Sequence, residues 1–291
     1  MEGRVFTLIA GLGLALLLAG NAGSTGSPPP TLTAGFSQFA SGPDGGTVWQ
    51  GVIPNPEVRG TSRPTVVYVP PQFSLDQRYP VVYLLHGFPG SPYGYVTMLS
   101  QRADEMISAG HLAPFIAVIP PAGLTARFNG EWTGVWEDYL VRQVVPWTDA
   151  HLPTIPHARD RVVGGLSAGG YGAVDIGLRH PRLFGTLEAW SGTFTAPRDG
   201  SLAQADAAQL SAHDPSLLLR REALLVRRLG IRIFLSCGRS DRLTALATEA
   251  FARELASVRV PHQLWLGPGR HDGRFWREQL PAALRYAIRS T

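Results

Sequence analysis

Residues 165–169 have the composition and spacing that could present a serine as a nucleophile. The peptide GLSAG fits the pattern G-x-S-x-G with Ser167 at its centre, between strand-like residues 161–163 and helix-like residues 173–178. The two glycines remove the Cβ atoms that would collide with a sharp strand-to-helix turn. The N–H groups at the start of the helix would then face the negative charge that develops on a substrate oxygen during attack by the serine. A purely structural glycine-rich turn is the alternative.

A serine hydroxyl becomes reactive only when a base takes its proton, and the base needs an acid to orient it. Asp241 follows a later predicted strand and is the candidate acid, and His271 follows the last predicted strand and is the candidate base. Serine, acid and histidine follow one another in the chain in the order expected where the serine lies at a strand-to-helix turn of this kind. His262 is a rival base, but it begins a strand. Asp272 and Asp214 are rival acids, and Asp272 is poorly placed to bond the ring of its own neighbour.

The oxygen of a tetrahedral intermediate carries negative charge, which backbone N–H groups can stabilise. Ala168, the residue after the serine, is one expected donor. The second donor is expected from residues 86–91, which follow a predicted strand, and Phe88 is the candidate because Pro89 has no N–H. His86 is expected to brace this loop rather than to act as the base.

These residues must be positioned by strands that alternate with helices, a pattern typical of a mostly parallel sheet with helices on both faces. The predicted strands are residues 47–53, 64–69, 81–85, 115–119, 160–165, 185–190, 231–235 and 262–266. The predicted helices are residues 95–109, 136–151, 172–179, 216–229, 243–257 and 273–289, whereas residues 191–215 are expected to be irregular. We therefore predict an α/β fold.

The composition is that of a globular protein, with 44% hydrophobic and 16% charged residues. The net charge is +4 and every cationic side chain outside histidine is an arginine, interspersed with acidic residues, so no nucleic-acid partner is expected. Cys237 is the only cysteine in the sequence, which excludes an intrachain disulfide. Neither a metal-ligand cluster nor a phosphate-binding loop is apparent, so we expect no cofactor and no metal.

The N-terminal segment has the composition of a secretory signal peptide. Arg4 precedes the apolar residues 5–19, and small residues up to Ala22 suit cleavage there, although an uncleaved anchor is the alternative. The protein is therefore expected to be secreted or held at the cell envelope. The expected organisation is a signal peptide at 1–22, a Pro/Gly/Ser-rich linker at 23–46 and one catalytic domain at 47–291.

Seven short motifs occur in an order that resembles a known esterase family. They are residues 83–88, 136–140, 165–173, 180–184, 191–192, 237–241 and 271–276. The family contains S-formylglutathione hydrolases, feruloyl esterases and actinobacterial mycolyltransferases, and the resemblance covers about residues 47–290. It implies an α/β-hydrolase sheet of about eight strands. It also implies a triad of Ser167, Asp241 and His271, with Phe88 and Ala168 as oxyanion donors.

By the same resemblance, Phe128, Trp132 and Trp136 would line the mouth of the site. Trp276, five residues after His271, is expected to add a wall. Exposed aromatic rings there could hold an acyl chain, an aryl ring or a sugar face. The alternative is that they cap the core beneath the loop. The expected partner is a small-molecule, lipid or sugar ester, with transient membrane contact only through the signal segment.

The leading interpretation is a secreted serine carboxylic-ester hydrolase that forms an acyl-enzyme on Ser167. An extracellular acyltransferase, in which a sugar or another alcohol replaces water, is the first alternative. Ala168, where mycolyltransferases usually have methionine, and His86, where they often have aspartate, count against trehalose mycolyl transfer. A non-catalytic surface-binding member of the fold is the second alternative.

Overall fold

The computed structural model describes residues 32–58, 63–123 and 132–288, and these residues contain nine strands joined in one sheet. The sheet order is β1-β2-β3-β5-β4-β6-β7-β8-β9. The strands are β1 (Phe36–Ser41), β2 (Thr47–Gly51), β3 (Thr65–Val69), β4 (Val81–Leu85), β5 (Ile116–Ile119), β6 (Arg161–Leu166), β7 (Thr186–Trp190), β8 (Arg232–Gly238) and β9 (His262–Gly267).

Most of the sheet is parallel. Strands β4 to β9 pair in parallel with one another, whereas β1, β2 and β3 extend the sheet by antiparallel pairing. All five residues of β4 are buried apolar side chains, as expected for a strand covered on both faces. Because β4, β6, β8 and β9 run in the same direction, the loops that follow them meet at one edge of the sheet.

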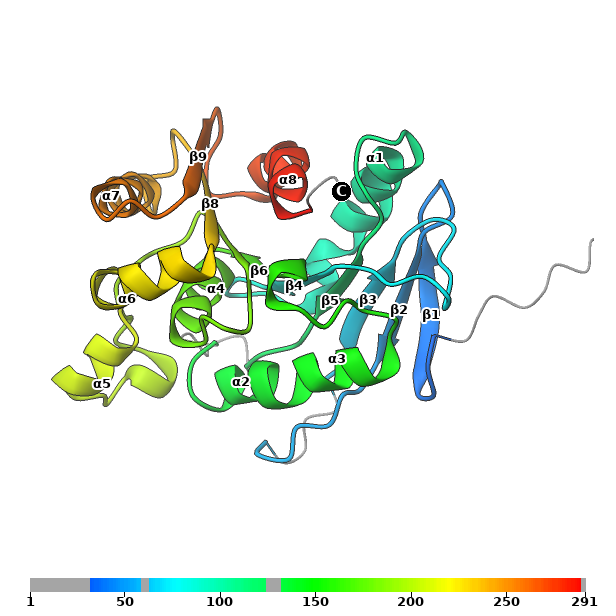
Figure 1. Cartoon of the computed structure of the whole chain (residues 1–291), viewed down its shortest axis with the longest axis horizontal. Helices are drawn as coiled ribbons and strands as arrows, with labels where there is room; N and C mark the ends of the chain where they lie inside the picture. The colour runs from blue at the N-terminus through cyan, green and yellow to red at the C-terminus, as the bar shows by residue number, and fades with distance from the viewer. Residues whose placement is uncertain (1–31, 59–62, 124–131, 289–291) are drawn as a thin grey trace, which may run out of the picture. The chain divides into compact units, whose positions relative to one another are not determined.

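Helices cover both faces of the sheet, as predicted. Side chains of α1 and α8 belong to the core on one face, and those of α3, α4, α6 and α7 to the core on the other. Figure 1 shows α1 and α8 above the strands and α2 and α3 below them. The helices are α1 (Asp104–Ser108), α2 (Val135–Asp138), α3 (Val145–His151), α4 (Ala168–Arg179), α5 (Ala207–Ala212), α6 (Pro215–Leu229), α7 (Ala245–Ser257) and α8 (Gly273–Ala287).

Strand β1 corrects the prediction that residues 23–46 form a linker. This edge strand is mostly polar and exposed, so its sequence has little hydrophobic signal. One residue, Phe36, is buried and stacks on Trp147 with the ring centroids 4.9 Å apart. A single long-range contact of this kind cannot be seen in a local pattern. It also makes nine strands where about eight were expected.

One further prediction about helices needs correction. Residues 191–215, expected to be irregular, contain α5, which Asp206 begins as a capping box with Gln209. The helix predicted at 136–151 is confirmed, because α2, the helical segment Tyr139–Val144 and α3 follow one another without a gap from Val135 to His151. Pro146, which has no N–H, lies in the first turn of α3.

None of the helices within the described residues has the length and apolar character needed to cross a bilayer. The predicted signal peptide at residues 1–22 lies outside the described residues.

Candidate active site

Ser167 occupies the sharp turn that the sequence predicts between a strand and a helix. Its backbone lies in the left-handed region at φ 56° and ψ −120°, after the end of β6 and before the start of α4. A Cβ added at Gly165 would lie 2.5 Å from the carbonyl oxygen of Leu85 and from the backbone of Gly169. A Cβ at Gly169 would collide with the same Leu85 oxygen. Both glycines are therefore required for β4, β6 and α4 to approach so closely.

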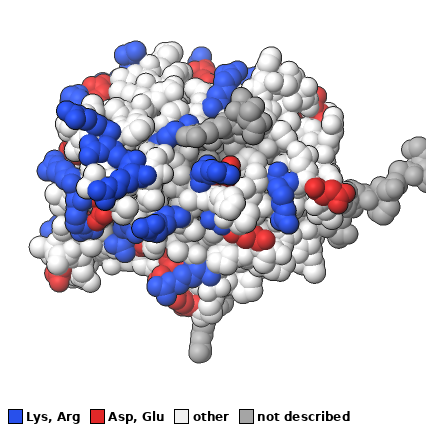
Figure 2. Space-filling model, in the orientation of Figure 1, with Lys and Arg blue, Asp and Glu red and all other residues white. Residues whose placement is uncertain are grey.

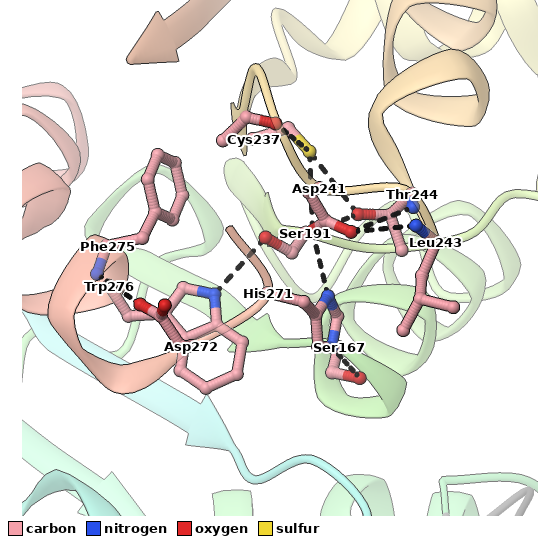
Figure 3. Close-up of polar contacts among 11 residues, drawn as sticks. Ser167, Ser191, Cys237, Asp241, Leu243, Thr244, His271, Asp272, Phe275 and Trp276 are labelled. Atoms are coloured by element: carbon pink, nitrogen blue, oxygen red, sulfur yellow. Dashed lines mark hydrogen bonds and ion pairs between the residues drawn. The ribbon is translucent and has the colours of Figure 1, made fainter. Parts of the chain in front are cut away.

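The structure brings the three predicted side chains together at one edge of the sheet (Figure 3). His271 Nε2 lies 2.9 Å from Ser167 Oγ, and His271 Nδ1 lies 2.8 Å from Asp241 Oδ2. The three residues follow β6, β8 and β9 respectively. This is the arrangement in which a histidine can accept the proton of a serine while a carboxylate orients its ring.

The rival residues have other contacts. His262 begins β9, and its Nδ1 lies 2.9 Å from the carbonyl oxygen of Val260. Asp272 is the N-cap of α8, and Asp214 is the N-cap of α6. Each of these carboxylates accepts a backbone N–H of the helix it caps. None of the three forms a hydrogen bond to Ser167 or His271.

Asp241 is held in a cradle that the sequence analysis did not identify. Its Oδ1 accepts the N–H groups of Leu243 and Thr244 at 3.0 and 3.1 Å, and its Oδ2 accepts the Thr244 hydroxyl at 2.7 Å. Burial would raise the pKa of Asp241, but the bonds from Thr244 and His271 outweigh burial and leave it below its usual value. A threonine three residues after the acid is the sequence signal that could have indicated this cradle.

The expected oxyanion loop lies against the candidate nucleophile. A Cβ added at Gly87 would lie 2.7 Å from Leu166 Cδ1 and 3.1 Å from the Cβ of Ser167, so a larger residue there would require the turn at Ser167 to shift. His86 braces the loop, because its Nε2 accepts the N–H of Ala122 and its Nδ1 therefore donates to the carbonyl oxygen of Gly87. Burial lowers the pKa of His86 to about 4, which keeps the ring neutral as these bonds require.

The structure corrects the expectation that Trp132 and Trp136 line the mouth of the site. Both side chains are buried in the core. The Trp132 indole donates to the carbonyl oxygen of His86 at 2.9 Å, and the Trp136 ring packs edge-on against Tyr139. They support the oxyanion loop and the helix beneath it. Phe128 lies outside the described residues.

Trp276 is the aromatic residue that lies beside the candidate base. Its half-buried ring is nearly perpendicular to the His271 ring, with the centroids 5.2 Å apart. Its indole N–H donates to Ser191 Oγ at 3.2 Å, which fixes the ring in place (Figure 3). Of Trp132, Trp136 and Trp276, only Trp276 therefore lies beside the site as an aromatic wall.

A parallel sheet covered on both faces, with a serine at a strained turn between β6 and α4, defines an α/β-hydrolase. The family model described as "Putative esterase" matches residues 57–287, and the chain belongs to this esterase family. The resemblance seen in the seven sequence motifs is thereby confirmed.

Several curated proteins are similar to parts of this chain. An endo-1,4-beta-xylanase/feruloyl esterase of Xylanibacter ruminicola is 31% identical over 131 residues, which are 43% of this chain and 18% of that protein. An esterase of Mycobacterium tuberculosis is 28% identical over 142 residues, 47% of this chain and 30% of that protein. An acetyl esterase of Caldicellulosiruptor saccharolyticus is 24% identical over 225 residues, 70% of this chain and 82% of that protein. The chain thus spans less than a third of the first two.

Solved structures share the fold. A ferulic acid esterase has a TM-score of 0.72 at 22% identity, over 84% of this chain and 97% of that one. An S-formylglutathione hydrolase from Agrobacterium tumefaciens has a TM-score of 0.69 at 16% identity, over 86% of this chain and 97% of that one. These similarities confirm the predicted α/β-hydrolase fold.

Proposed function

We propose that this chain is a serine carboxylic-ester hydrolase in which Ser167 is the nucleophile, His271 the base and Asp241 the orienting acid. The observation that supports the proposal most is the unbroken chain of hydrogen bonds from Asp241 through His271 to Ser167. Membership of the esterase family and the similarity to named feruloyl and acetyl esterases support the same chemistry.

In the first half of the reaction, His271 Nε2 takes the proton of Ser167 as Oγ attacks the ester carbonyl carbon. The tetrahedral intermediate then collapses, the bond to the alcohol oxygen breaks, and His271 donates its proton to the leaving alcohol. In the second half, water loses a proton to His271 and attacks the acyl-enzyme, which releases the acid and restores the serine. Asp241 stays ionised throughout and stabilises the imidazolium that forms in each half.

Two backbone N–H groups are proposed to stabilise the oxyanion. Ala168 is the first residue of α4, so its N–H has no acceptor within the helix and is directed toward the turn. Phe88 follows Gly87, which is packed against Ser167. Donors fixed before the reaction in this way cost no reorganisation when charge develops.

The activity is tested by Ser167→Ala in the purified protein, with a p-nitrophenyl ester as substrate. We expect turnover to fall by about a thousandfold or more, because the triad acts as a unit. Ser240→Ala, which changes an exposed serine in the loop after β8, is the matched control and should keep the wild-type rate. If Ser167→Ala kept more than about a tenth of the rate, the assignment would be refuted.

The substrate is proposed to be a small-molecule, lipid or sugar ester whose acyl or aryl group contacts Trp276. An acyl-enzyme can also be attacked by a sugar or another alcohol, so the acyltransferase alternative shares the first half of the reaction. Adding trehalose or glycerol to the assay and searching for a new ester separates the two. A fluorophosphonate probe that left Ser167 unlabelled in the folded protein would favour the non-catalytic alternative.

Export through residues 1–22 remains part of the proposal, and the N-terminal residue of the mature protein, determined by mass spectrometry, tests it.

A further inference from the structure

Two leucines beside the site are exposed to a degree unusual for their type. Leu243 is 74% exposed and Leu246 is 83% exposed, more than any other large apolar side chain within the described residues. Leu243 lies in the loop that follows β8, and Leu246 in the first turn of α7. Single exposed apolar residues are common on protein surfaces, but two within four positions, directly after the candidate acid, form a local apolar feature.

Three exposed arginines accompany these leucines. Arg239 and Arg242 belong to the loop after β8, and Arg270 to the loop after β9. Within the described residues, none of the three guanidinium groups forms an ion pair with a carboxylate. The two acidic residues of these loops are engaged elsewhere, because Asp241 is buried against His271 and Asp272 caps α8. The exposed surface of the loops is therefore cationic.

The two loops are held side by side by backbone hydrogen bonds. The N–H of Arg239 donates to Gly267 at 2.9 Å, and the N–H of Ser240 donates to Gly269 at 3.0 Å. Since β6, β8 and β9 are parallel, both loops lie at the edge of the sheet that carries Ser167. We call the exposed surface of the two loops and the start of α7 at this edge the leucine–arginine rim. It consists of Leu243, Leu246, Arg239, Arg242 and Arg270.

The rim continues into a broader arginine-rich surface. Figure 2 shows arginine side chains outnumbering acidic ones on its left part, over α6 and α7 of Figure 1. The exposed arginines on these two helices are Arg220, Arg221, Arg227, Arg228 and Arg253. Three of them form ion pairs, Arg220 with Glu254, Arg221 with Glu222 and Arg253 with Glu249, so five arginines and three glutamates leave an excess of two positive charges on these helices. This excess adds to the attraction that the rim exerts on an anionic partner.

We propose that the leucine–arginine rim docks this protein on an anionic lipid surface. The two leucines would enter the boundary between head groups and acyl chains, while the guanidinium groups pair with lipid phosphates. Docking by these loops turns the edge of the sheet that holds Ser167 toward the lipid. The sequence analysis placed membrane contact in the N-terminal segment alone, and the rim adds a contact in the folded domain. The inference does not depend on the proposed hydrolysis.

Binding to vesicles tests the proposal directly. The protein used in this assay lacks residues 1–22, because the apolar residues 5–19 would themselves enter a bilayer. The truncation leaves Leu32–Thr291, which forms a compact unit, intact. It carries Ser167→Ala so that no lipid ester is turned over. Co-sedimentation is measured with vesicles of mixed phosphatidylglycerol and phosphatidylcholine and with vesicles of phosphatidylcholine alone. We expect clearly stronger binding to the anionic vesicles.

Substitutions in the rim should weaken this binding. Each arginine near an anionic surface contributes about a fivefold gain in affinity, so R239Q/R242Q should bind roughly thirtyfold more weakly. Leu246→Ser should weaken binding about tenfold or more, since a leucine side chain no longer leaves water. The two effects are separable, because salt should reduce the arginine contribution and leave the leucine contribution largely unchanged.

Matched controls change similar residues away from the rim. R78Q/R182Q removes the same charge from two exposed arginines that, like those of the rim, form no ion pair within the described residues, and Leu75→Ser removes a leucine that is 57% exposed. Arg78 and Leu75 precede β4 and Arg182 precedes β7, so all three lie at the edge of the sheet opposite to the one that carries Ser167. Both controls should bind like the parent protein. The proposal is overturned if the parent ignores anionic vesicles, if the controls lose as much binding as the rim variants, or if Leu246→Ser instead abolishes self-association measured without lipid.

Discussion

At the scale of single residues, the reactivity proposed for Ser167 depends on how firmly Asp241 keeps its charge. A buried carboxylate that lost its hydrogen bonds would tend to take up a proton and could no longer stabilise a histidinium. In this protein, two N–H groups and one hydroxyl, all within the three residues that follow, prevent this. The acid is thus prepared by its own loop before any substrate arrives.

Thr244→Val tests this preparation. The substitution keeps the shape of the side chain but removes the hydroxyl that lies 2.7 Å from Asp241 Oδ2. Hydrogen bonds to charged groups contribute about 1.5 to 3 kcal/mol, so we expect kcat to fall about tenfold to a hundredfold with little change in KM. The pKa of Asp241 should rise toward its usual value.

The control for this measurement is Thr148→Val, which removes an equally buried hydroxyl that donates to the carbonyl oxygen of Val144 in the helical region that includes α3. It should lower thermal stability and leave kcat unchanged. Equal kcat values for Thr244→Val and the wild type would show that the two N–H groups alone hold the acid.

At the scale of secondary-structure elements, one tyrosine joins the two strands that carry the proposed nucleophile and the proposed oxyanion loop. Tyr95 ends the short helical segment Pro92–Tyr95, and its hydroxyl is completely buried. It donates to the carbonyl oxygen of Leu85 at 2.8 Å and accepts the N–H of Leu166 at 3.1 Å. Leu85 is the last residue of β4 and Leu166 the last of β6, so the hydroxyl fixes their spacing where the two strands end.

Tyr95→Phe removes this connection without emptying the space that the ring fills. We expect kcat to fall about tenfold or more with KM nearly unchanged, because displacing the proposed oxyanion donor would affect the transition state more than substrate binding. Burial raises the pKa of Tyr95, so the hydroxyl remains a donor at every pH at which the assay is run.

Tyr68→Phe is the comparison that separates positioning from stability. Its hydroxyl is also buried and donates to Asp104 at 2.6 Å, but the residue lies on β3, away from the site. Both variants should lose stability, and only Tyr95→Phe should lose kcat. A similar kcat loss in both variants would mean that general loosening of the core, not the spacing of β4 and β6, limits the rate.

The elements that the sequence predicted correctly are those with strong local patterns. Continuous apolar runs identified β4 and β5, and the predicted strand ends placed Ser167, Asp241 and His271 in loops that meet in the structure. The side chains that were misplaced or missed depend on contacts between distant segments. The local sequence around Trp132 does not distinguish an indole that packs under His86, as this one does, from an indole that lines a pocket. The hydroxyl of Tyr95 likewise gains its role only when two other strands converge on it.

At the scale of the whole molecule, the sheet contains a carboxyl group that should make stability depend on pH. Glu188 lies on β7 in the middle of the sheet and is almost completely buried. Its Oε2 accepts the Trp190 indole N–H at 3.1 Å, and its Oε1 has no hydrogen-bond partner among the described residues. Burial raises the pKa of Glu188 to about 8, although the charge of Arg232 opposes the shift.

The folded protein therefore keeps a proton on Glu188 that the unfolded chain releases above its ordinary pKa of 4.5. Below about pH 4.5 both states are protonated and the contribution is constant; between about pH 4.5 and 8 the unfolded state is favoured increasingly as the pH rises. Across this window the free energy of unfolding should lose roughly 3 to 5 kcal/mol through this one group.

Glu188→Gln, a neutral side chain of nearly the same shape, isolates this contribution. Denaturant unfolding of the variant and the wild type at about pH 5 and about pH 8 gives the stability difference at each pH. From the lower to the higher pH, the free energy of unfolding of the variant should rise by several kcal/mol relative to that of the wild type, as expected from the raised pKa of Glu188. Buried His86, whose pKa is lowered to about 4, titrates in both proteins and cancels from the difference. An unchanged difference at the two values would show that Glu188 is ionised inside the folded sheet and that the indole of Trp190 and the charge of Arg232 suffice to hold its charge there.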